Sequence, residues 1–354
     1  MIRKKTIHFL TLTLLAGIFL SFTVYTGIGT ALSAEAREDK RIDSFNQTFY
    51  RDDAVLSLVD YVEYKIFGCI DNGNVIIGKD EWLFEAVDSR NGYERLLDYL
   101  GGCPLSEDEL KAIARTLSAR QSAYEAENID YILMVIPDSM NVCSDKVPWY
   151  LGERSQNARL SQLSAYLNEK GIHCMVDPTE KMIEESTEMP MYNNTENSIN
   201  AYGAYCIYNT AVSKFLADTG REVDRIYRDD IDFYTRLTDG RGIAALSGLE
   251  RTIENRTVSL TDSAPKNYQV TYSSKGFVAT KRTTPAQPSE EDKCVVVECA
   301  DDWDRTQLTP YFSGTFDSVY YRSTLLDRPE TAKQYGATLV VQVLRESEIT
   351  KLLK

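Results

Sequence analysis

The chain has 354 residues, of which 43% are hydrophobic and 26% are charged, so it has a globular composition that excludes disordered, collagen-like and multi-span membrane proteins. Its formal net charge of −14 argues against DNA, RNA and anionic lipid as partners, because like charges repel. The two histidines, His8 and His173, are too few for a zinc site built on several histidines. We therefore expect no metal, no other cofactor and no nucleic-acid partner.

Residues 1–35 are predicted to be a membrane anchor or a signal segment. The basic stretch Met1–Lys5 precedes Phe9–Leu32, a run of 24 residues without a charged side chain, whereas a bilayer requires about 20. Small residues such as Ala34 and Ala36 near the end of this run also allow signal cleavage. Both alternatives place the remainder outside the cytoplasm, because the basic end stays inside. We expect a single-pass cell-membrane protein with an extracytoplasmic domain, or a secreted protein if the signal is cleaved.

Residues 36–74 are predicted to form a mostly helical linker, and residues 75–354 an α/β domain. The apolar run Val75–Phe84, broken by a turn, predicts a hairpin. Ser106 and Glu109 have capping-box spacing and predict the start of a helix. Tyr131–Pro137 is a continuous apolar strand of the type that is buried on both faces of a parallel sheet.

Further along the chain, predicted helices and strands alternate. Helices are expected at 160–167, 179–185 and 201–217, and strands at 172–176, 294–298, 318–322 and 338–344. This alternation predicts a mostly parallel sheet flanked by helices. Residues 221–292 depart from it, because short polar β-like segments such as Thr257–Leu260, Tyr268–Tyr272 and Gly276–Thr280 lie between turn residues. We interpret them as a β-rich insertion within the domain.

The seven cysteines fit an oxidising compartment only in part, because an odd number leaves at least one thiol unpaired within the chain. Cys69 and Cys103 lie in glycine-flanked segments and are the first candidates for a disulfide.

Four segments, in this order, resemble the AlgJ/AlgX-type SGNH-hydrolase-like family, which includes the DHHW-motif proteins. Gly78–Phe84 (GKDEWLF) is similar to the family's GKDGWLF, with Glu81 in the place of glycine. Val135–Asp138 with the later Val147-Pro148 resembles VPDK…LP. Residues 192–205 (YNNTENSINAYGAY) resemble Y-x-x-T-D-x-H-W-N-x-x-G-A-Y, and residues 338–346 resemble the last strand and its acidic turn.

The resemblance implies an SGNH-like fold and a role in O-acylation, chiefly O-acetylation, of a cell-surface polysaccharide, with a membrane O-acyltransferase as partner. The family works through a Ser-His-Asp triad, and this chain departs from it. The family's Asp falls on Glu196 and its His on Ser198. Its Ser falls near Asp302 and Trp303, and no serine lies between residues 293 and 311. A serine hydroxyl is a weak nucleophile without a base, so the departure bears directly on activity.

Our first hypothesis is a catalytically degenerate member, a pseudoenzyme that binds glycan or serves as a scaffold for partners. The alternative is an active O-acetyltransferase or acetylesterase with nonstandard residues, in which Ser139 is the nucleophile and Lys146 or Glu196 the base. A structural envelope protein is a third reading.

Other side chains are candidates for a substrate-binding or cation-binding site. Tyr192, Asn200 and Tyr202 are candidate substrate contacts, because rings with polar tips suit sugar faces, although packing explains most of the 22 tyrosines. The aspartates at 301, 302 and 304 suit either a divalent cation or the N-terminus of a helix, and we favour the helix. His173 is interpreted as an ordinary strand or surface residue.

Overall fold

The computed structural model describes residues 74–88, 90–261, 268–273, 276–281, 294–323 and 328–353. The predicted anchor or signal segment at 1–35, the predicted linker up to residue 73 and Cys69, the predicted partner of Cys103, lie outside these ranges. Within the described ranges, no helix combines the length and the apolar character that crossing a membrane requires.

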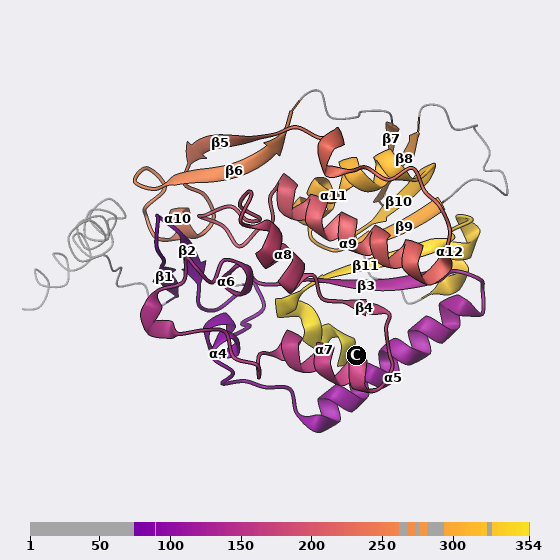
Figure 1. The fold of residues 1–354 in the computed structure, drawn as a ribbon, viewed down its shortest axis with the longest axis horizontal. Helices are drawn as coiled ribbons and strands as arrows, with labels where there is room; N and C mark the ends of the chain where they lie inside the picture. Colours follow the sequence, from indigo (N-terminus) through magenta and orange to yellow (C-terminus); the bar gives the residue numbers. More distant parts are fainter. Residues whose placement is uncertain are drawn as a thin grey trace, which may run out of the picture. The chain divides into compact units, whose positions relative to one another are not determined.

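The centre of the domain is a seven-stranded sheet with the order β4-β3-β11-β9-β10-β8-β7 (Figure 1). Five neighbouring strands are parallel: β4 (Met175–Val176), β3 (Asp130–Ile136), β11 (Leu339–Arg345), β9 (Cys294–Cys299) and β10 (Ser318–Arg322). Every residue of β9 and β11 is buried, which is why these strands consist of nearly continuous apolar runs. The predicted parallel sheet is confirmed, although β4 is shorter than predicted.

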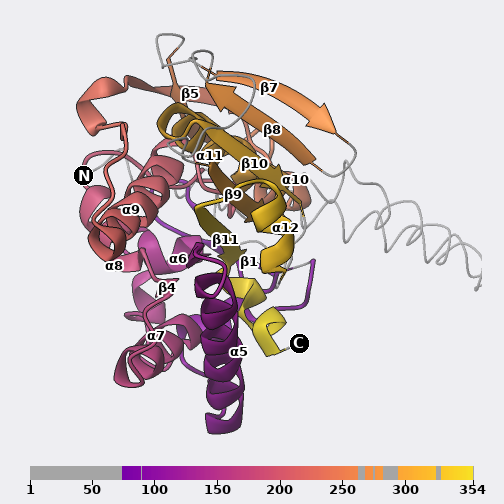
Figure 2. The same ribbon diagram turned by 90° about the vertical axis from the view of Figure 1, so that its right-hand side faces the viewer.

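Helices cover both faces of the sheet, as Figure 2 shows. The core on one face includes residues of α6 (Ser139–Val142), α8 (Thr179–Glu185), α9 (Ala201–Thr219) and α11 (Asp302–Thr315). The core on the other face includes residues of α5 (Glu107–Glu125), α7 (Arg159–Glu169), α12 (Pro329–Gln334) and the 3-10 helix η3 (Glu346–Leu353). This two-layer covering is the α/β arrangement that the alternating pattern predicted.

The ends of two long helices follow from local chemistry. At the start of α5, the Ser106 hydroxyl accepts from the Glu109 N–H at 3.3 Å, and the Glu109 carboxylate accepts from the Ser106 N–H at 2.8 Å, so the predicted capping box is confirmed. Asn200 caps α9 by accepting from two backbone N–H groups. Gly220 ends α9 with a φ of 64°, a conformation that glycine adopts without steric cost.

The predicted hairpin is formed by β1 (Val75–Ile77) and β2 (Leu83–Glu85), which pair antiparallel. Its turn carries Asp80 and Glu81 at φ values of 55° and 64°. The left-handed region costs a non-glycine residue roughly 1–2 kcal/mol. Glu81 stands where the resembling motif has glycine, so this chain adopts the turn with the less suitable residue.

The described part of the segment predicted as a β-rich insertion contains strands in two groups. β5 (Phe233–Asp239) and β6 (Glu254–Leu260) form a separate antiparallel pair, joined through α10 (Ile243–Leu246). β7 (Tyr268–Ser273) and β8 (Gly276–Lys281) instead extend the main sheet, because β8 pairs antiparallel with β10. The described elements are completed by α4 (Arg95–Tyr99) and by the 3-10 helices η1 (Trp149–Leu151) and η2 (Arg228–Asp230).

Candidate functional site

The carboxyl ends of the three central strands meet at one edge of the sheet, which lies toward α6 and the β1–β2 hairpin in Figure 1. Asp138 follows β3, Glu346 follows β11, and Asp301 follows β9. Open α/β sheets place their reactive and binding groups at this edge. Here it is occupied by ionisable side chains, both carboxyl groups and arginines.

Arg345, the last residue of β11, holds the start of α11. Its Nε lies 2.6 Å from one Asp304 oxygen, a second nitrogen lies 2.9 Å from the other, and Asp301 lies at 3.0 Å. A further nitrogen donates to the backbone carbonyl of Asn197 at 3.1 Å. Burial raises the pKa of the Asp304 carboxyl to about 6, although the charge of Arg345 acts in the opposite direction.

A second arginine, Arg95 of α4, lies among three carboxylates. It forms ion pairs with Asp88 and Asp138, and its Nε lies 3.5 Å from Glu85. Arg90 also binds Asp88 at 3.1 Å and thereby extends the cluster. Burial raises the pKa of Asp88, but the hydrogen bond from Arg90 and the charge of Arg95 outweigh it and lower this pKa to about 2.

Glu346 is fully buried and receives hydrogen bonds from three donors. The backbone N–H of Asp138 donates at 2.8 Å, the side-chain amide of Asn141 at 2.6 Å, and Arg154 at 3.3 Å. Burial raises the pKa of the Glu346 carboxyl to about 8, against the charge of Arg154.

Asn197 connects this charged edge to the loop at residues 193–199. Its side-chain amide donates to Asp138 at 2.9 Å, and its side-chain oxygen accepts from the Ser139 N–H at 2.9 Å. On the other side of the loop, the Thr195 hydroxyl donates to the Asn255 side chain of β6 at 3.0 Å. The loop that carries two of the predicted triad positions, Glu196 and Ser198, is therefore held between α6 and β6.

Two residues at predicted triad positions, Glu196 of the loop and Trp303 of α11, line one pocket of about 100 Å³. The other residues that line it are Asn193, Arg236, Thr238, Arg241, Asn255, Thr257, Val258, Ser259 and Gln307. The Trp303 indole N–H donates to the carbonyl of Ile199 at 2.7 Å, which holds the ring against the loop. The Glu196 carboxylate accepts from the Asn193 amide at 2.9 Å.

The third triad position, Ser198, is half-buried, and its backbone carbonyl accepts from the Asn193 N–H at 3.2 Å. Asp302 is the exposed first residue of α11 and pairs with Arg305. Asp301 caps this helix, so the predicted helix N-terminus is confirmed. Among the described residues, no group of three or more His, Cys, Asp or Glu side chains is arranged to hold a metal ion.

Ser139 begins α6 at the same edge and is buried. Lys146, one of its two suggested bases, forms an ion pair with Asp80 at 2.8 Å and another with Asp145 at 3.2 Å. The other, Glu196, accepts from Asn193. In the described part of the chain, no hydrogen bond joins the Ser139 hydroxyl to either of them.

The three candidate substrate contacts are inside the protein. Tyr192 donates its hydroxyl to the Pro137 carbonyl at 2.5 Å, and Tyr202 donates to Glu185 at 3.0 Å. Asn200 is fully buried as the cap of α9. Each has a relative exposure of 1% or less, so the structure gives them packing and capping roles instead of a surface for a sugar.

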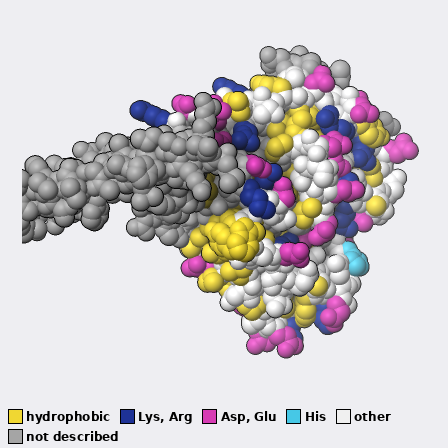
Figure 3. All heavy atoms as spheres, turned by 60° about the vertical axis from the view of Figure 1, so that its left-hand side comes forward, with side chains coloured by type: hydrophobic (Ala, Val, Ile, Leu, Met, Phe, Trp, Pro, Cys, Tyr) yellow, Lys and Arg dark blue, Asp and Glu magenta, His cyan; other side chains and the backbone are white. Residues whose placement is uncertain are grey.

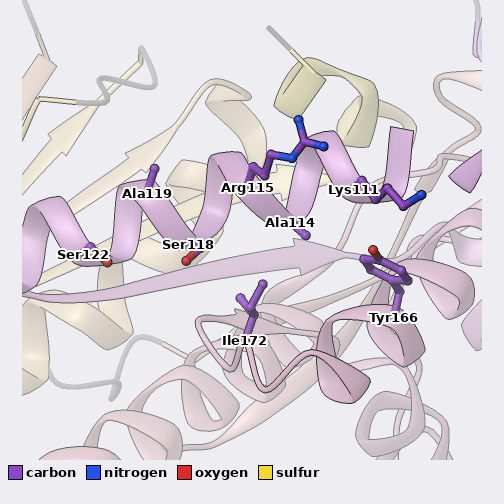
Figure 4. Close-up of a pocket in the computed structure, with 8 residues that line it drawn as sticks. All are labelled: Lys111, Ala114, Arg115, Ser118, Ala119, Ser122, Tyr166 and Ile172. Carbon is purple, nitrogen blue, oxygen red and sulfur yellow. The ribbon is translucent and has the colours of Figure 1, made fainter. Parts of the chain in front are cut away.

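Two larger hollows lie away from this edge. The first, of about 460 Å³, is lined by residues of α5, which include Lys111 and Arg115, and by Tyr166 and Ile172 (Figure 4). The second, of about 350 Å³, includes His173 and Asp130, which lie at the amino-terminal ends of β4 and β3. The sole histidine outside the N-terminal segment is therefore at the opposite edge of the sheet from Glu196 and Trp303.

A parallel sheet covered on both faces, with its polar cluster at the carboxyl edge, defines an SGNH-like α/β domain. Residues 75–235 match a family model described as an SGNH hydrolase-like domain, acetyltransferase AlgX. Residues 75–235 are thus similar to the SGNH hydrolase-like domain of AlgX-type proteins, and the resemblance recognised from the motifs is confirmed for this part of the chain.

Solved structures support the same fold at low sequence identity. Bacillus cereus PatB1 with a sulfonyl adduct is 12% identical, covers 79% of this chain with 99% of its own, and has a TM-score of 0.54. A DHHW family protein from Eubacterium siraeum is 12% identical, covers 79% of this chain with 97% of its own, and has a TM-score of 0.53. Among curated proteins, none is significantly similar to the chain.

Proposed function

We propose that this protein takes part in the O-acetylation of a cell-surface polysaccharide as a member that binds glycan without performing acyl transfer. The match to an acetyltransferase family model supports the connection to O-acetylation. The glycan-binding part rests on the polar pocket at the carboxyl edge, which contains an indole ring with 38% of its surface exposed.

One observation carries the catalytic half of the proposal. Trp303, near the position of the family's serine, donates its indole N–H to the Ile199 carbonyl and lines the same pocket as Glu196. An indole has no hydroxyl to acylate, and Ser198 in the histidine position is no base at neutral pH. Loss of one triad member typically lowers the rate by several powers of ten.

The cellular setting of the proposal comes from the sequence. An uncharged run behind a basic N-terminus directs residues 36–354 out of the cytoplasm, where cell-surface glycans are found. A membrane O-acyltransferase is the expected partner, since a chain without its own triad requires another protein to move the acyl group.

The test combines turnover with binding on the purified protein. Hydrolysis of an activated aryl acetate and of an acetylated glycan is measured beside Ser139→Ala and Ser198→Ala, and binding is measured on a glycan array. We expect no turnover above the two variants, together with saturable glycan binding. Turnover abolished by one serine substitution would establish an active enzyme and name its nucleophile. Absence of glycan binding would refute the binding role.

A further inference from the structure

Two arginines that line the pocket have no carboxylate partner among the residues that the structure describes. Arg236 of β5 and Arg241, which follows β5, both contribute to its wall, and no described residue forms an ion pair with either guanidinium group. Two other arginines do have carboxylate partners. Arg256 of β6 pairs with Glu81 at 3.0 Å, and the buried Arg345 pairs with Asp304. The chain has a net charge of −14, yet two arginines without an ion pair to any described residue line this one pocket.

The antiparallel strands β5 and β6 bring hydrogen-bonding side chains to the pocket that Trp303 also lines. Arg236 pairs in register with Thr257, and Thr238 pairs with Asn255, so side chains at these positions share one face of β5–β6. That face consists of hydrogen-bonding groups and one cation, while Trp303 supplies the apolar part of the wall. Among the described residues that line the pocket, Glu196 is the only carboxylate, and it already accepts a hydrogen bond from Asn193. Counted over the lining residues, the pocket therefore has an excess of positive charge.

The size of the pocket restricts what enters it. Its volume is about 100 Å³, whereas sites that enclose a whole small ligand measure about 300–1,000 Å³. It has room for one substituent of a larger ligand, with the rest of that ligand lying across the exposed surface. On the face of the molecule that Figure 3 draws, basic and acidic side chains are intermixed.

We infer that this pocket receives an anionic substituent, a carboxylate or a phosphate group, carried by a sugar of the bound glycan. The planar guanidinium groups of Arg236 and Arg241 hold its oxygens through charge-assisted hydrogen bonds, and the sugar ring lies against Trp303. This inference rests on the proposed function, because it specifies the class of glycan that the same pocket selects. No covalent step is involved.

The test is a comparison of glycan classes by the intact protein. An array that holds neutral, uronate-containing and phosphate-bearing oligosaccharides is probed first, and the best binders are then titrated. We expect one anionic class to bind about tenfold more tightly than neutral glycans of equal length, and this preference to weaken as salt is added. The class that binds distinguishes a carboxylate from a phosphate.

The double variant Arg236→Gln/Arg241→Gln is expected to lose the preference and to bind both classes equally. Lys111→Gln/Arg115→Gln is the matched control, because it also removes two positive charges, but from a different hollow (Figure 4). Both substituted arginines of the double variant are exposed, and equal unfolding temperatures would show that the fold is kept. Equal affinity of the unaltered protein for neutral and anionic glycans, or a preference that survives the double substitution, would overturn the inference and leave glycan binding intact. No binding to any class would overturn the proposed function as well.

Discussion

Replacing Arg95 with methionine tests whether the carboxyl edge is held together by its buried charges. Arg95 has a relative exposure of 3% and forms ion pairs with Asp88 and Asp138, which are 0% and 5% exposed. Methionine fills similar space but leaves these carboxylates without their cation. Removing one partner of a buried ion pair costs about 3–5 kcal/mol. We expect the free energy of unfolding, measured by urea denaturation, to fall by about this amount.

The control is a pair of the same chemistry in contact with solvent. Arg221 and Asp130 lie 3.2 Å apart with side-chain exposures of 43% and 36%. An exposed pair contributes about 0–1 kcal/mol, so Arg221→Met should change the unfolding free energy by no more than that. Arg95→Lys keeps a charge but cannot bridge several carboxylates, and an intermediate loss is expected. If Arg95→Met cost no more than Arg221→Met, the reasoning about burial would be wrong.

Three further outcomes are expected. Burial raises the pKa values of Glu346 and Asp304 in the folded protein to about 8 and about 6. Their protonated forms therefore stabilise the folded state fully below the pKa values of the unfolded chain, near 4, and this stability is lost as the pH rises through the pKa values of the folded protein. Urea unfolding from pH 5 to 9 should show this decline, and Glu346→Gln should make it shallower; an unchanged slope would count against it. Trp303→Ala should weaken glycan binding about tenfold in titration, because it removes the exposed ring, while equal affinity would place the sugar elsewhere. Glu81→Gly should raise the unfolding free energy by up to about 1 kcal/mol, since relief of the positive φ exceeds the loss of an exposed pair with Arg256; a loss would show that the pair dominates.

Much of the fold could be predicted because its signals are local. The apolar run at residues 131–137 and the Ser106 cap each specify an element without reference to distant residues. β5 was missed, because most of its side chains are exposed on both faces and no alternation marks it. The addition of β7 and β8 to the main sheet was also beyond the sequence, since pairing with β10 depends on contacts far along the chain.

The site was predictable to a smaller extent. The motif resemblance assigned Glu196 and Trp303 to one site, and the two residues line the same pocket although they are far apart in sequence. Arg95 and Arg345 were missed, because an arginine in a buried ion-pair network looks like a surface arginine until its partners are placed around it. Tyr192 was selected as a ring with a polar tip, but the same pattern describes a core tyrosine whose hydroxyl binds a backbone carbonyl.

The position of β11 constrains how the chain reaches its fold. This strand lies between β3 and β9, and the Tyr131 hydroxyl of β3 donates to Gln342 of β11, 211 residues later. Synthesis proceeds from the N-terminus, so β11 emerges after both of its neighbours, and until then the edge of β3 that pairs with β11 stays unpaired. Such delayed, long-range pairing folds slowly and exposes strands to aggregation. The nascent protein must therefore avoid aggregation through the unpaired edge of β3 until residues 339–345 are made. A truncation before these residues would leave β4–β3 and β9–β10–β8–β7 as two separate sheets.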